Sequence, residues 1–434
     1  MNRRTFLGSA TQAGLAATLA PALAAQTTDD RHTVQELHAE LPKALIGPEA
    51  EAGYFSEERL YTALGTRELK KPTDVQVIAY NFPSWHPSPW MEARFGKGWT
   101  EFDPLRNARS LFPGHSMPHY PLWGYYNEAE PEWAAREVDL AHAYGVDAWL
   151  IDWYWHEGTQ FYHEQIEQGL LKTPNRDKIK FAVMWANHDW KNVYPARSPF
   201  QAATMLPQTH TIADLERVME YCAERYFSQS NYLRIDGAPL FAFFDYGKLI
   251  EQLKPDGVKR GLDLMRERAA KLGFPKIHLQ VCNGYDGHAP LHEMGIDSGA
   301  QYGNFGWTYG GKPPGSRIPY GVGVTEGIAV WKTFRDSLSV PFHPCVQVGW
   351  DDSPRFEEFA AIAINRTPDQ FERFVRAARH EMAEVKHTKL LYVAAWNEWT
   401  EDHVLLPDTY WGYSYLEALR RGARGNDYQA SKQS

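Results

Sequence analysis

Two glutamates near the carboxyl end of the chain have the types and spacing of a catalytic acid and base. Glu398 and Glu401 lie three residues apart in the run WNEWTE. Glycosidic bond cleavage requires one protonated carboxyl to protonate the leaving oxygen and one carboxylate to act as base or nucleophile. On one face of a helical turn, mutual repulsion would raise the pKa of one of the two and keep it a working acid. The alternative is a pair of glutamates on an exposed loop.

Short apolar runs recur along the chain and would form the strands that position this pair. Most are continuous, as strands buried on both faces are, and helical segments such as 132–144 separate them, which favours parallel βα units. A further helix is predicted to begin at Thr367 with a capping box. We therefore predict a TIM (β/α)8 barrel with strands at Val75 to Tyr80, Val146 to Ile151, Ile179 to Trp185, Leu240 to Phe244, Ile277 to Cys282, Asp297 to Tyr302, Cys345 to Trp350 and Leu390 to Trp396.

In such a barrel, side chains at the carboxyl ends of the strands converge on one site, whatever their separation in sequence. Here these positions carry amides, carboxylates, an arginine and several indoles, which suit a hydroxyl-rich ligand. Each polar residue could instead cap a loop, and each aromatic residue could instead pack in the core. The predicted substrate-binding residues are Tyr80, His115, Asp152, Tyr154, Trp155, Trp185, Asn187, His188, Tyr302, Trp350, Asp351, Arg355, Trp396 and Asn397.

Composition and motifs exclude several classes of function. The formal charge of -9, without a basic stripe, argues against nucleic acid and anionic membranes as partners. Three scattered cysteines allow at most one disulfide and suggest no thiolate zinc site. His188, Asp189, His343, Asp351 and Asp352 are possible metal ligands, but no HExxH spacing supports them. Since GxGxxG, GxxxxGK[ST] and GxSxG are also absent from the sequence, we expect no cofactor and no catalytic metal.

The first residues have the pattern of a twin-arginine export signal. Arg3 and Arg4 precede an Ala-rich apolar stretch and the small-residue pattern Ala22, Leu23, Ala24. A membrane anchor is the alternative, but polar residues and glycines dilute the stretch. We predict a signal at residues 1–24, an extension at 25–74, the barrel at 75–420 and a flexible tail at 421–434. After cleavage of the signal, we expect the protein to be periplasmic or secreted and not to be stably inserted in a membrane.

Several longer motifs resemble the WbsX-type family, also described as glycoside hydrolase family 99-like. They are FGKGWTEF (95–102), LFPGHSMP (111–118), LWGYYN (122–127), AYGVDAWLIDWYW (143–155), WANHDW (185–190), GWDDSPR (349–355) and WNEWTE (396–401). The resemblance implies a TIM barrel related to endo-acting α-mannosidases that hydrolyse with retention. It also implies that Glu398 assists attack by the substrate's own 2-hydroxyl, while Glu401 serves as acid and then base.

The chain departs from the pattern of that family at three places. His188 stands where the family commonly has Glu, Asp402 where it has Gly, and the run 405–407 reads Leu-Leu-Pro instead of Leu-Glu-Pro. These differences bear on the substrate and leave the glutamate pair unchanged. Three hypotheses follow: a retaining hydrolase of an α-linked polysaccharide or glycan, mannan-like or other; a transferase of cell-surface polysaccharide assembly; and a non-catalytic carbohydrate-binding barrel.

Overall fold

The computed structural model describes residues 75–194, 202–284, 290–303, 313, 315–383 and 385–424. The predicted export signal and N-terminal extension, and all of the predicted tail after Arg424, lie outside these residues. None of the helices in the described part of the chain combines the length and hydropathy that a membrane crossing requires.

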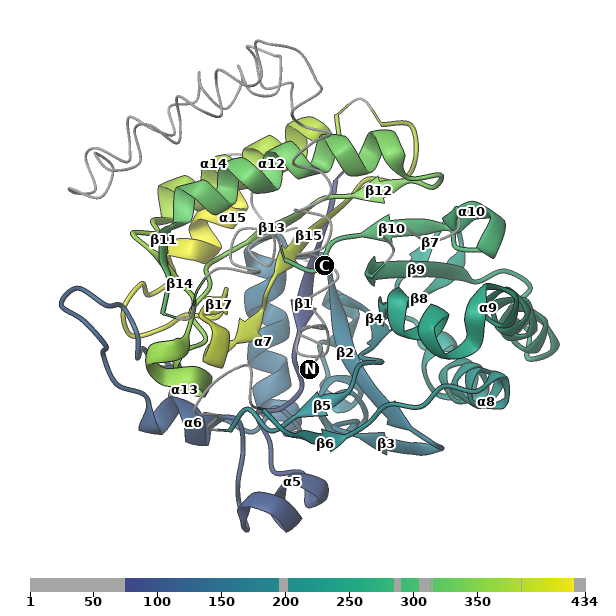
Figure 1. The fold of residues 1–434 in the computed structure, drawn as a ribbon, viewed down its shortest axis with the longest axis horizontal. Helices are drawn as coiled ribbons and strands as arrows, with labels where there is room; N and C mark the ends of the chain where they lie inside the picture. The colour runs from purple at the N-terminus through teal and green to yellow at the C-terminus, as the bar shows by residue number, and fades with distance from the viewer. Residues whose placement is uncertain are drawn as a thin grey trace.

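Eight parallel strands close into a barrel in the described part of the chain. The sheet order is β12-β10-β9-β8-β4-β2-β1-β15-β13, and its two end strands, β12 and β13, are separated in sequence by Pro344 alone, so the last strand to close the sheet is one interrupted strand (Figure 1). The predicted TIM barrel is therefore confirmed. The barrel strands are β1 (Gln76–Asn81), β2 (Ala148–His156), β4 (Lys180–Trp185), β8 (Ala238–Asp245), β9 (His278–Asn283), β10 (Ser298–Ala300), β12 (Phe342–His343), β13 (Cys345–Gln347) and β15 (Leu390–Ala394).

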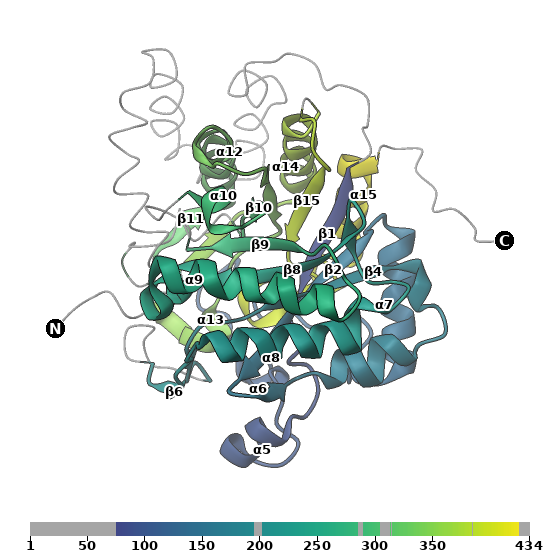
Figure 2. The same cartoon turned by 90° about the vertical axis from the view of Figure 1, so that its right-hand side faces the viewer.

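Helices surround the barrel, as Figures 1 and 2 show. Helices α8 (Ile212–Cys222) and α9 (Tyr246–Lys271) contact each other beside β8 and β9. Helices α14 (Pro368–Glu381) and α15 (Ser414–Arg424) pack together beside β13. The predicted capping box is present, because the Thr367 side chain accepts from Gln370 N–H while the Gln370 side chain accepts from Thr367 N–H. The main helices are α7 (Pro131–Ala143), α8 (Ile212–Cys222), α9 (Tyr246–Lys271), α10 (Leu291–Met294), α12 (Tyr320–Ser337), α14 (Pro368–Glu381) and α15 (Ser414–Arg424). The helix α15 thus continues past residue 420.

Short elements decorate the two ends of the barrel. Those that contact one another around the predicted glutamate pair are α6 (Phe102–Asn107), α13 (Ser353–Phe356), η7 (Trp399–Glu401), β16 (Asn397–Glu398) and β17 (His403–Val404). The remainder are α5 (Pro89–Phe95), β3 (Thr159–Phe161), η1 (Gln165–Gly169), η2 (Leu170–Lys172), η3 (Arg176–Lys178), β5 (Trp190–Lys191), β6 (Thr204–Leu206), η5 (Ala223–Phe227), β7 (Arg234–Ile235), β11 (Arg317–Pro319), η6 (Glu357–Phe359) and β14 (Ile362–Ile364).

The barrel interior contains tyrosines whose hydroxyls are hydrogen-bonded. Tyr392 Oη donates to Gln280 Oε1 at 2.8 Å, and Tyr80 Oη donates to the Gln301 carbonyl at 3.0 Å. Both side chains are fully buried. Because a buried hydroxyl without a partner costs free energy, these bonds let the wide interior be filled by large rings. All three cysteines are buried, and none of them forms a disulfide.

Candidate active site

The glutamate pair lies at the carboxyl end of the last barrel strand. Glu398 ends β16 and Glu401 ends the helical turn η7, and the Asp351 N–H donates to the Glu401 carbonyl at 2.8 Å. The Glu398 residue is 4% exposed and the Glu401 side chain is 16% exposed. One carboxylate oxygen of each lies within 4.8 Å of the other. The two carboxyls are therefore so close that the ionisation of one affects the pKa of the other.

Arg355 and His403 bind Glu401 from two sides. Arg355 Nη1 donates to Glu401 Oε1, and His403 Nε2 lies 2.7 Å from Glu401 Oε2. The same arginine is more distant from the other glutamate, with Nη2 at 3.6 Å from Glu398 Oε2. Both oxygens of Glu401 thus have strong donors, as an ionised carboxylate needs.

The two carboxyls have opposite pKa shifts. Burial raises the pKa of Glu398 well above its ordinary value, and the nearby charge of Glu401 raises it further. Burial alone would also raise the pKa of Glu401, but Arg355 and the hydrogen bond from His403 lower it to about 2. As the pH rises, Glu401 therefore ionises first, and Glu398 keeps its proton to higher pH.

Four other predicted residues lie around the pair. Tyr302 Oη donates to Glu398 Oε1 at 3.3 Å. Burial raises the pKa of Tyr154, and the nearby Asp152 and Glu398 carboxyls raise it further. Burial, followed by the charge of Glu401, raises the pKa of Asp152 well above its ordinary value. Among the described residues, Asp152 Oδ1 has no hydrogen-bond partner. Burial lowers the pKa of His188, so this ring is neutral near neutral pH.

The hydrogen-bonding groups of four predicted residues, Asn187, Asn397, His115 and Asp351, are used inside the protein. Asn187 exchanges two bonds of 2.8 Å with the Asp245 backbone, and Asn397 binds the Phe82 backbone with both ends of its amide. His115 Nε2 lies 2.5 Å from Asp351 Oδ2, and the two form a buried pair. These side chains hold the loops of the site in place.

Most of the remaining predicted aromatic residues are also buried or hydrogen-bonded inside the protein, and one of them borders the glutamate pair. Trp155 donates its indole N–H to Asp214 Oδ1 at 3.1 Å, and Trp185 donates its own to the Trp155 carbonyl at 3.2 Å. Trp396 is fully buried against Trp149, and Tyr80 is fully buried in the barrel. Trp350, which is partly exposed, lies with its ring 5.3 Å from that of His403 and so borders the pair.

Three residues of the site were not among the sequence predictions: Glu101, Thr400 and His403. Glu101 Oε1 accepts from Arg355 Nε at 2.9 Å and Nη2 at 2.6 Å, and from Thr400 Oγ1 at 2.8 Å. The signal for Glu101 was its place in the motif FGKGWTEF, while Thr400 directly precedes Glu401 and His403 follows it by two residues.

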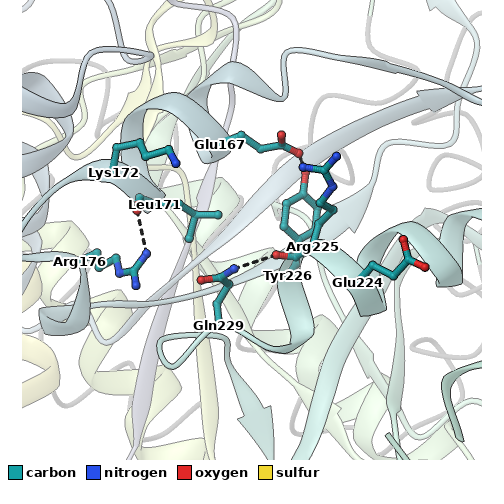
Figure 3. A pocket seen from close by; sticks show the side chains of 8 residues that line it. All are labelled: Glu167, Leu171, Lys172, Arg176, Glu224, Arg225, Tyr226 and Gln229. Carbon is teal, nitrogen blue, oxygen red and sulfur yellow. Dashed lines mark hydrogen bonds between the residues drawn. The ribbon is translucent and has the colours of Figure 1, made fainter. Parts of the chain in front are cut away.

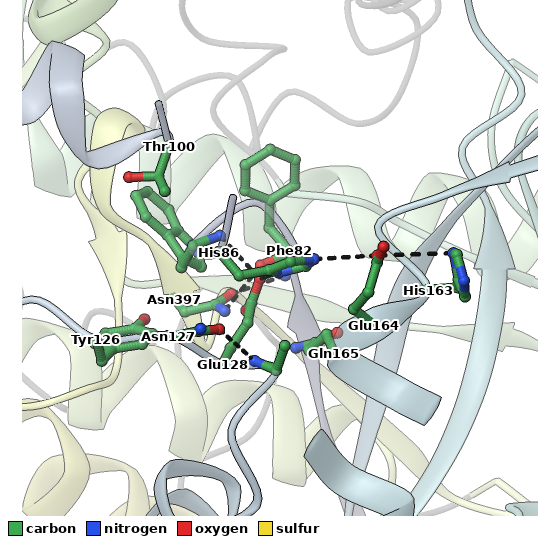
Figure 4. Close-up of polar contacts among 12 residues, drawn as sticks. Phe82, His86, Thr100, Tyr126, Asn127, Glu128, His163, Glu164, Gln165 and Asn397 are labelled. Atoms are coloured by element: carbon green, nitrogen blue, oxygen red, sulfur yellow. Dashed lines mark hydrogen bonds and ion pairs between the residues drawn. The ribbon is translucent and has the colours of Figure 1, made fainter. Parts of the chain in front are cut away.

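A second polar cluster supports the loop that follows β1 (Figure 4). His86 Nδ1 lies 2.9 Å from Glu128 Oε1, and His86 Nε2 lies 3.3 Å from Glu164 Oε2. Burial would lower the pKa of His86, but the hydrogen bonds to these two carboxylates raise it to about 9. Since Phe82 of the same loop binds Asn397, this cluster anchors the residue that precedes Glu398.

Glu398, Glu401 and His403 also have the composition of a metal site, with ligand atoms within 4.8 Å of one another. Their chemistry would fit a divalent cation. Arg355, however, already supplies a positive charge to Glu401, and a cation beside it would be repelled. The donor set therefore favours the ion pair over a metal.

A cavity of about 250 Å³ is lined by the short helical segments η1, η2, η3 and η5 (Figure 3). Its wall includes η3, which leads into the amino end of β4, so the cavity lies at the end of the barrel opposite the glutamate pair. Charges of both signs line it, and two of its polar groups are bonded within the protein: Glu167 accepts from Tyr226, and Arg176 donates to the Leu171 carbonyl. The cavity is not part of the candidate active site.

Comparison with known proteins assigns the family. The sequence profile of the family described as "Glycosyltransferase WbsX" matches residues 77–309 and 324–419. The chain belongs to the WbsX family. The resemblance seen in the sequence motifs is thus confirmed, and the matched ranges include both glutamates of the pair.

Individual relatives are more distant. A Xanthomonas campestris pv. campestris strain B100 protein named WxcX, itself uncharacterised, is 26% identical over 379 residues, which cover 83% of this chain and 51% of the relative. The chain spans about half the length of the curated relatives it matches.

Two solved structures share the fold. The GH99 endo-alpha-mannosidase from Bacteroides thetaiotaomicron is 13% identical, with a TM-score of 0.50 over 80% of this chain and 95% of that one. A protein described as glycoside hydrolase-like is 15% identical, with a TM-score of 0.55 over 85% of this chain and 99% of that one. The chain therefore has the barrel fold of these proteins.

Proposed function

We propose that this protein is a glycoside hydrolase that cleaves an α-linked polysaccharide or glycan with retention. The observation that carries the proposal is the pair Glu398 and Glu401, which have carboxylate oxygens within 4.8 Å of each other and pKa values shifted in opposite directions. Retaining enzymes have closely spaced carboxyls, whereas inverting enzymes separate them by about 6.5–9.5 Å to admit a water molecule. The fold shared with the GH99 endo-alpha-mannosidase supports an α-linked, mannose-like substrate.

In the proposed reaction, Glu398 protonates the glycosidic oxygen, and the leaving sugar departs as an alcohol. The Glu401 carboxylate accepts the proton of the substrate's own 2-hydroxyl, whose oxygen attacks the anomeric carbon to give an anhydro-sugar. In the second step, Glu398, now ionised, deprotonates the attacking water, and Glu401 returns its proton to the 2-oxygen. Both carboxyls regain their first states, and two displacements give retention. The order is the reverse of that implied by the family resemblance, because the pKa of Glu398 is raised and that of Glu401 is lowered.

Activity assays on a panel of α-linked polysaccharides, with products sized by chromatography, test the proposal. Glu401→Gln should reduce turnover of polysaccharide by about 10³-fold or more. Glu398→Gln should reduce it by about 10²–10⁴-fold, but only slightly for aryl glycosides whose leaving groups need no proton. If the variant that retains aryl glycoside cleavage is Glu401→Gln, the order of roles is wrong. If polysaccharide cleavage survives both substitutions, the site is wrong.

Sugar transfer is the second candidate, favoured by the family's description as a glycosyltransferase. A transferase would require an acceptor sugar, while a hydrolase releases reducing ends in water alone. The export pattern at residues 1–24 supports hydrolysis, since we propose a periplasmic or secreted location where sugar nucleotides are scarce. Cell fractionation with and without replacement of Arg3 and Arg4 by lysine tests this location, and retention of wild-type protein in the cytoplasm would contradict it.

A further inference from the structure

Glu101 is a buried carboxylate that the proposed reaction does not use. It lies immediately before α6, is 0% exposed, and belongs to the motif at residues 95–102. Its Oε1 accepts two hydrogen bonds from Arg355, of 2.9 and 2.6 Å, and one from Thr400 of 2.8 Å. A fully buried carboxylate is expensive unless it is paired, so this ion pair defines where Arg355 lies.

The guanidinium group of Arg355 is divided between two glutamates. Nε and Nη2 bind Glu101, and Nη1 binds Glu401. Because the group is planar and its donors form a rigid fork, fixing one edge fixes the direction of the remaining nitrogen. Thr400, which donates to Glu101, is the residue next to Glu401 and ties the helical turn to the same carboxylate.

We propose that Glu101 is a positioning residue that aims Arg355 at Glu401 and away from Glu398, and so separates the charge states of the pair. The chemical meaning of this role rests on the proposed glycosidase function. The geometry does not, since Nη2, which would otherwise be available to Glu398 at 3.6 Å, is bound to Glu101. Glu101 also balances the positive charge of Arg355, so that the arginine stabilises one carboxylate and not both.

The charges around the pair determine what removal of Glu101 does. Arg355 faces Glu101, Glu401, Glu398 and the Tyr194 hydroxyl. Burial is the first cause that raises the pKa of Glu398, followed by the charge of Glu401, with Asp152 and Glu101 adding to it. Other titratable groups that interact with Glu401 are His403, Asp352, Asp152, His188 and Tyr302. Without the charge of Glu101, Arg355 favours ionisation of Glu398, and the pKa of Glu398 falls.

Carbon-13 NMR of the full chain labelled at glutamate carboxyls tests the proposal without any substrate. Signals are assigned by loss in Glu398→Gln and Glu401→Gln. In Glu101→Gln, whose side chain keeps an acceptor for Arg355 and Thr400, the Glu398 signal should titrate about one pH unit lower than in the wild type. Glu372→Gln is the matched control, because Glu372 binds Arg376 and Arg421 on a helix of the outer layer, and it should leave both signals unchanged.

Arg355→Lys provides a second variant if Glu101→Gln does not fold. A lysine keeps the charge but cannot bind both glutamates as a fork, so the Glu401 signal should titrate above about 2. Unchanged titration of Glu398 in Glu101→Gln, or of Glu401 in Arg355→Lys, would overturn the proposal.

The activity assay separates this proposal from the proposed function. The alkaline limb of the kcat/KM profile, where Glu398 loses its proton, should move about one pH unit lower in Glu101→Gln, with a fall in kcat of about 10–100-fold. A residue that is merely structural would lower the amount of folded protein and leave the limb in place. If the NMR shift is found but wild-type protein cleaves no glycan, the function is wrong and the positioning role stands. If glycan is cleaved and the limb does not move, the positioning role is wrong.

Discussion

Replacement of Arg355 by glutamine should both destabilise the protein and change its response to acid. Arg355 is the largest of the causes that lower the pKa of Glu401 from its ordinary 4.5 to about 2. At about 1.4 kcal/mol per pKa unit, this shift of roughly 2.5 units corresponds to about 3 kcal/mol of stabilisation near neutral pH, of which Arg355 supplies the greater part. Removal of the arginine also leaves the buried Glu101 without its ion pair, which costs a further few kcal/mol, on the order of 3.

The sign of the pH dependence follows from the direction of the shift. A carboxyl whose pKa is lowered by folding stabilises the protein above its unfolded pKa, and this contribution is lost as the pH falls through the folded pKa. For Glu401 the window runs from about 4.5 down to about 2. The wild type should therefore lose this part of its stability across that window, whereas Arg355→Gln should already lack it, and the difference between the two should narrow as the pH falls.

Urea unfolding at about pH 7, 4.5 and 3 measures the difference, and kcat/KM over the same range reports the free enzyme. The acid limb, where Glu401 gains a proton, should rise by about two pH units in Arg355→Gln. Arg106→Gln is a suitable control, because it removes an ion pair with Asp103 in which both side chains are more than one third exposed. Equal destabilisation at all three pH values, together with an unmoved acid limb, would show that Arg355 does not lower the pKa of Glu401.

Three further predictions concern neighbouring groups. Asp152→Asn should lower kcat/KM by about tenfold through lost substrate contact and should move the alkaline limb to lower pH, because Asp152 adds to the charge that raises the pKa of Glu398; an unchanged profile would contradict this. His86, whose pKa is raised to about 9, should stabilise the protein by about 3 kcal/mol below about pH 6.5, and this stabilisation should be lost as the pH rises to about 9. Urea unfolding of His86→Gln should therefore show no such loss of stability between these pH values. EDTA should leave turnover unchanged; loss that a divalent cation restores would assign Glu398, Glu401 and His403 to a metal.

The sequence predicted the barrel well because its strands are buried on both faces. Continuous apolar runs such as Ile179 to Trp185 have few other interpretations, and the observed β4 spans Lys180–Trp185. The closing strand was the least complete prediction: Cys345 to Trp350 was expected, and the structure adds β12 before Pro344. Proline lacks the N–H that a continuous ladder needs, so the strand is divided at that residue.

The direction of side chains could not be read from position in sequence. Side chains alternate along a strand, so neighbours at one strand end face opposite sides of the barrel wall. In β2, Asp152 and Tyr154 face the glutamate pair, whereas Trp153 and Trp155 pack against Tyr221 of α8. An indole in a strand-end motif was therefore no guide to substrate contact. Glu101 was missed for another reason: it binds an arginine 254 residues away, and no local pattern encodes that pairing.

Hydrolysis of an α-linked polysaccharide in ¹⁸O-labelled water tests the proposed retaining hydrolysis. Each new reducing end should carry one ¹⁸O at its anomeric carbon, by mass spectrometry, and proton NMR of the first product should show the α anomer before mutarotation. Glu401→Gln should abolish both signals. A β anomer as first product, incorporation that requires an acceptor sugar, or labelled products formed equally well by Glu401→Gln would contradict it.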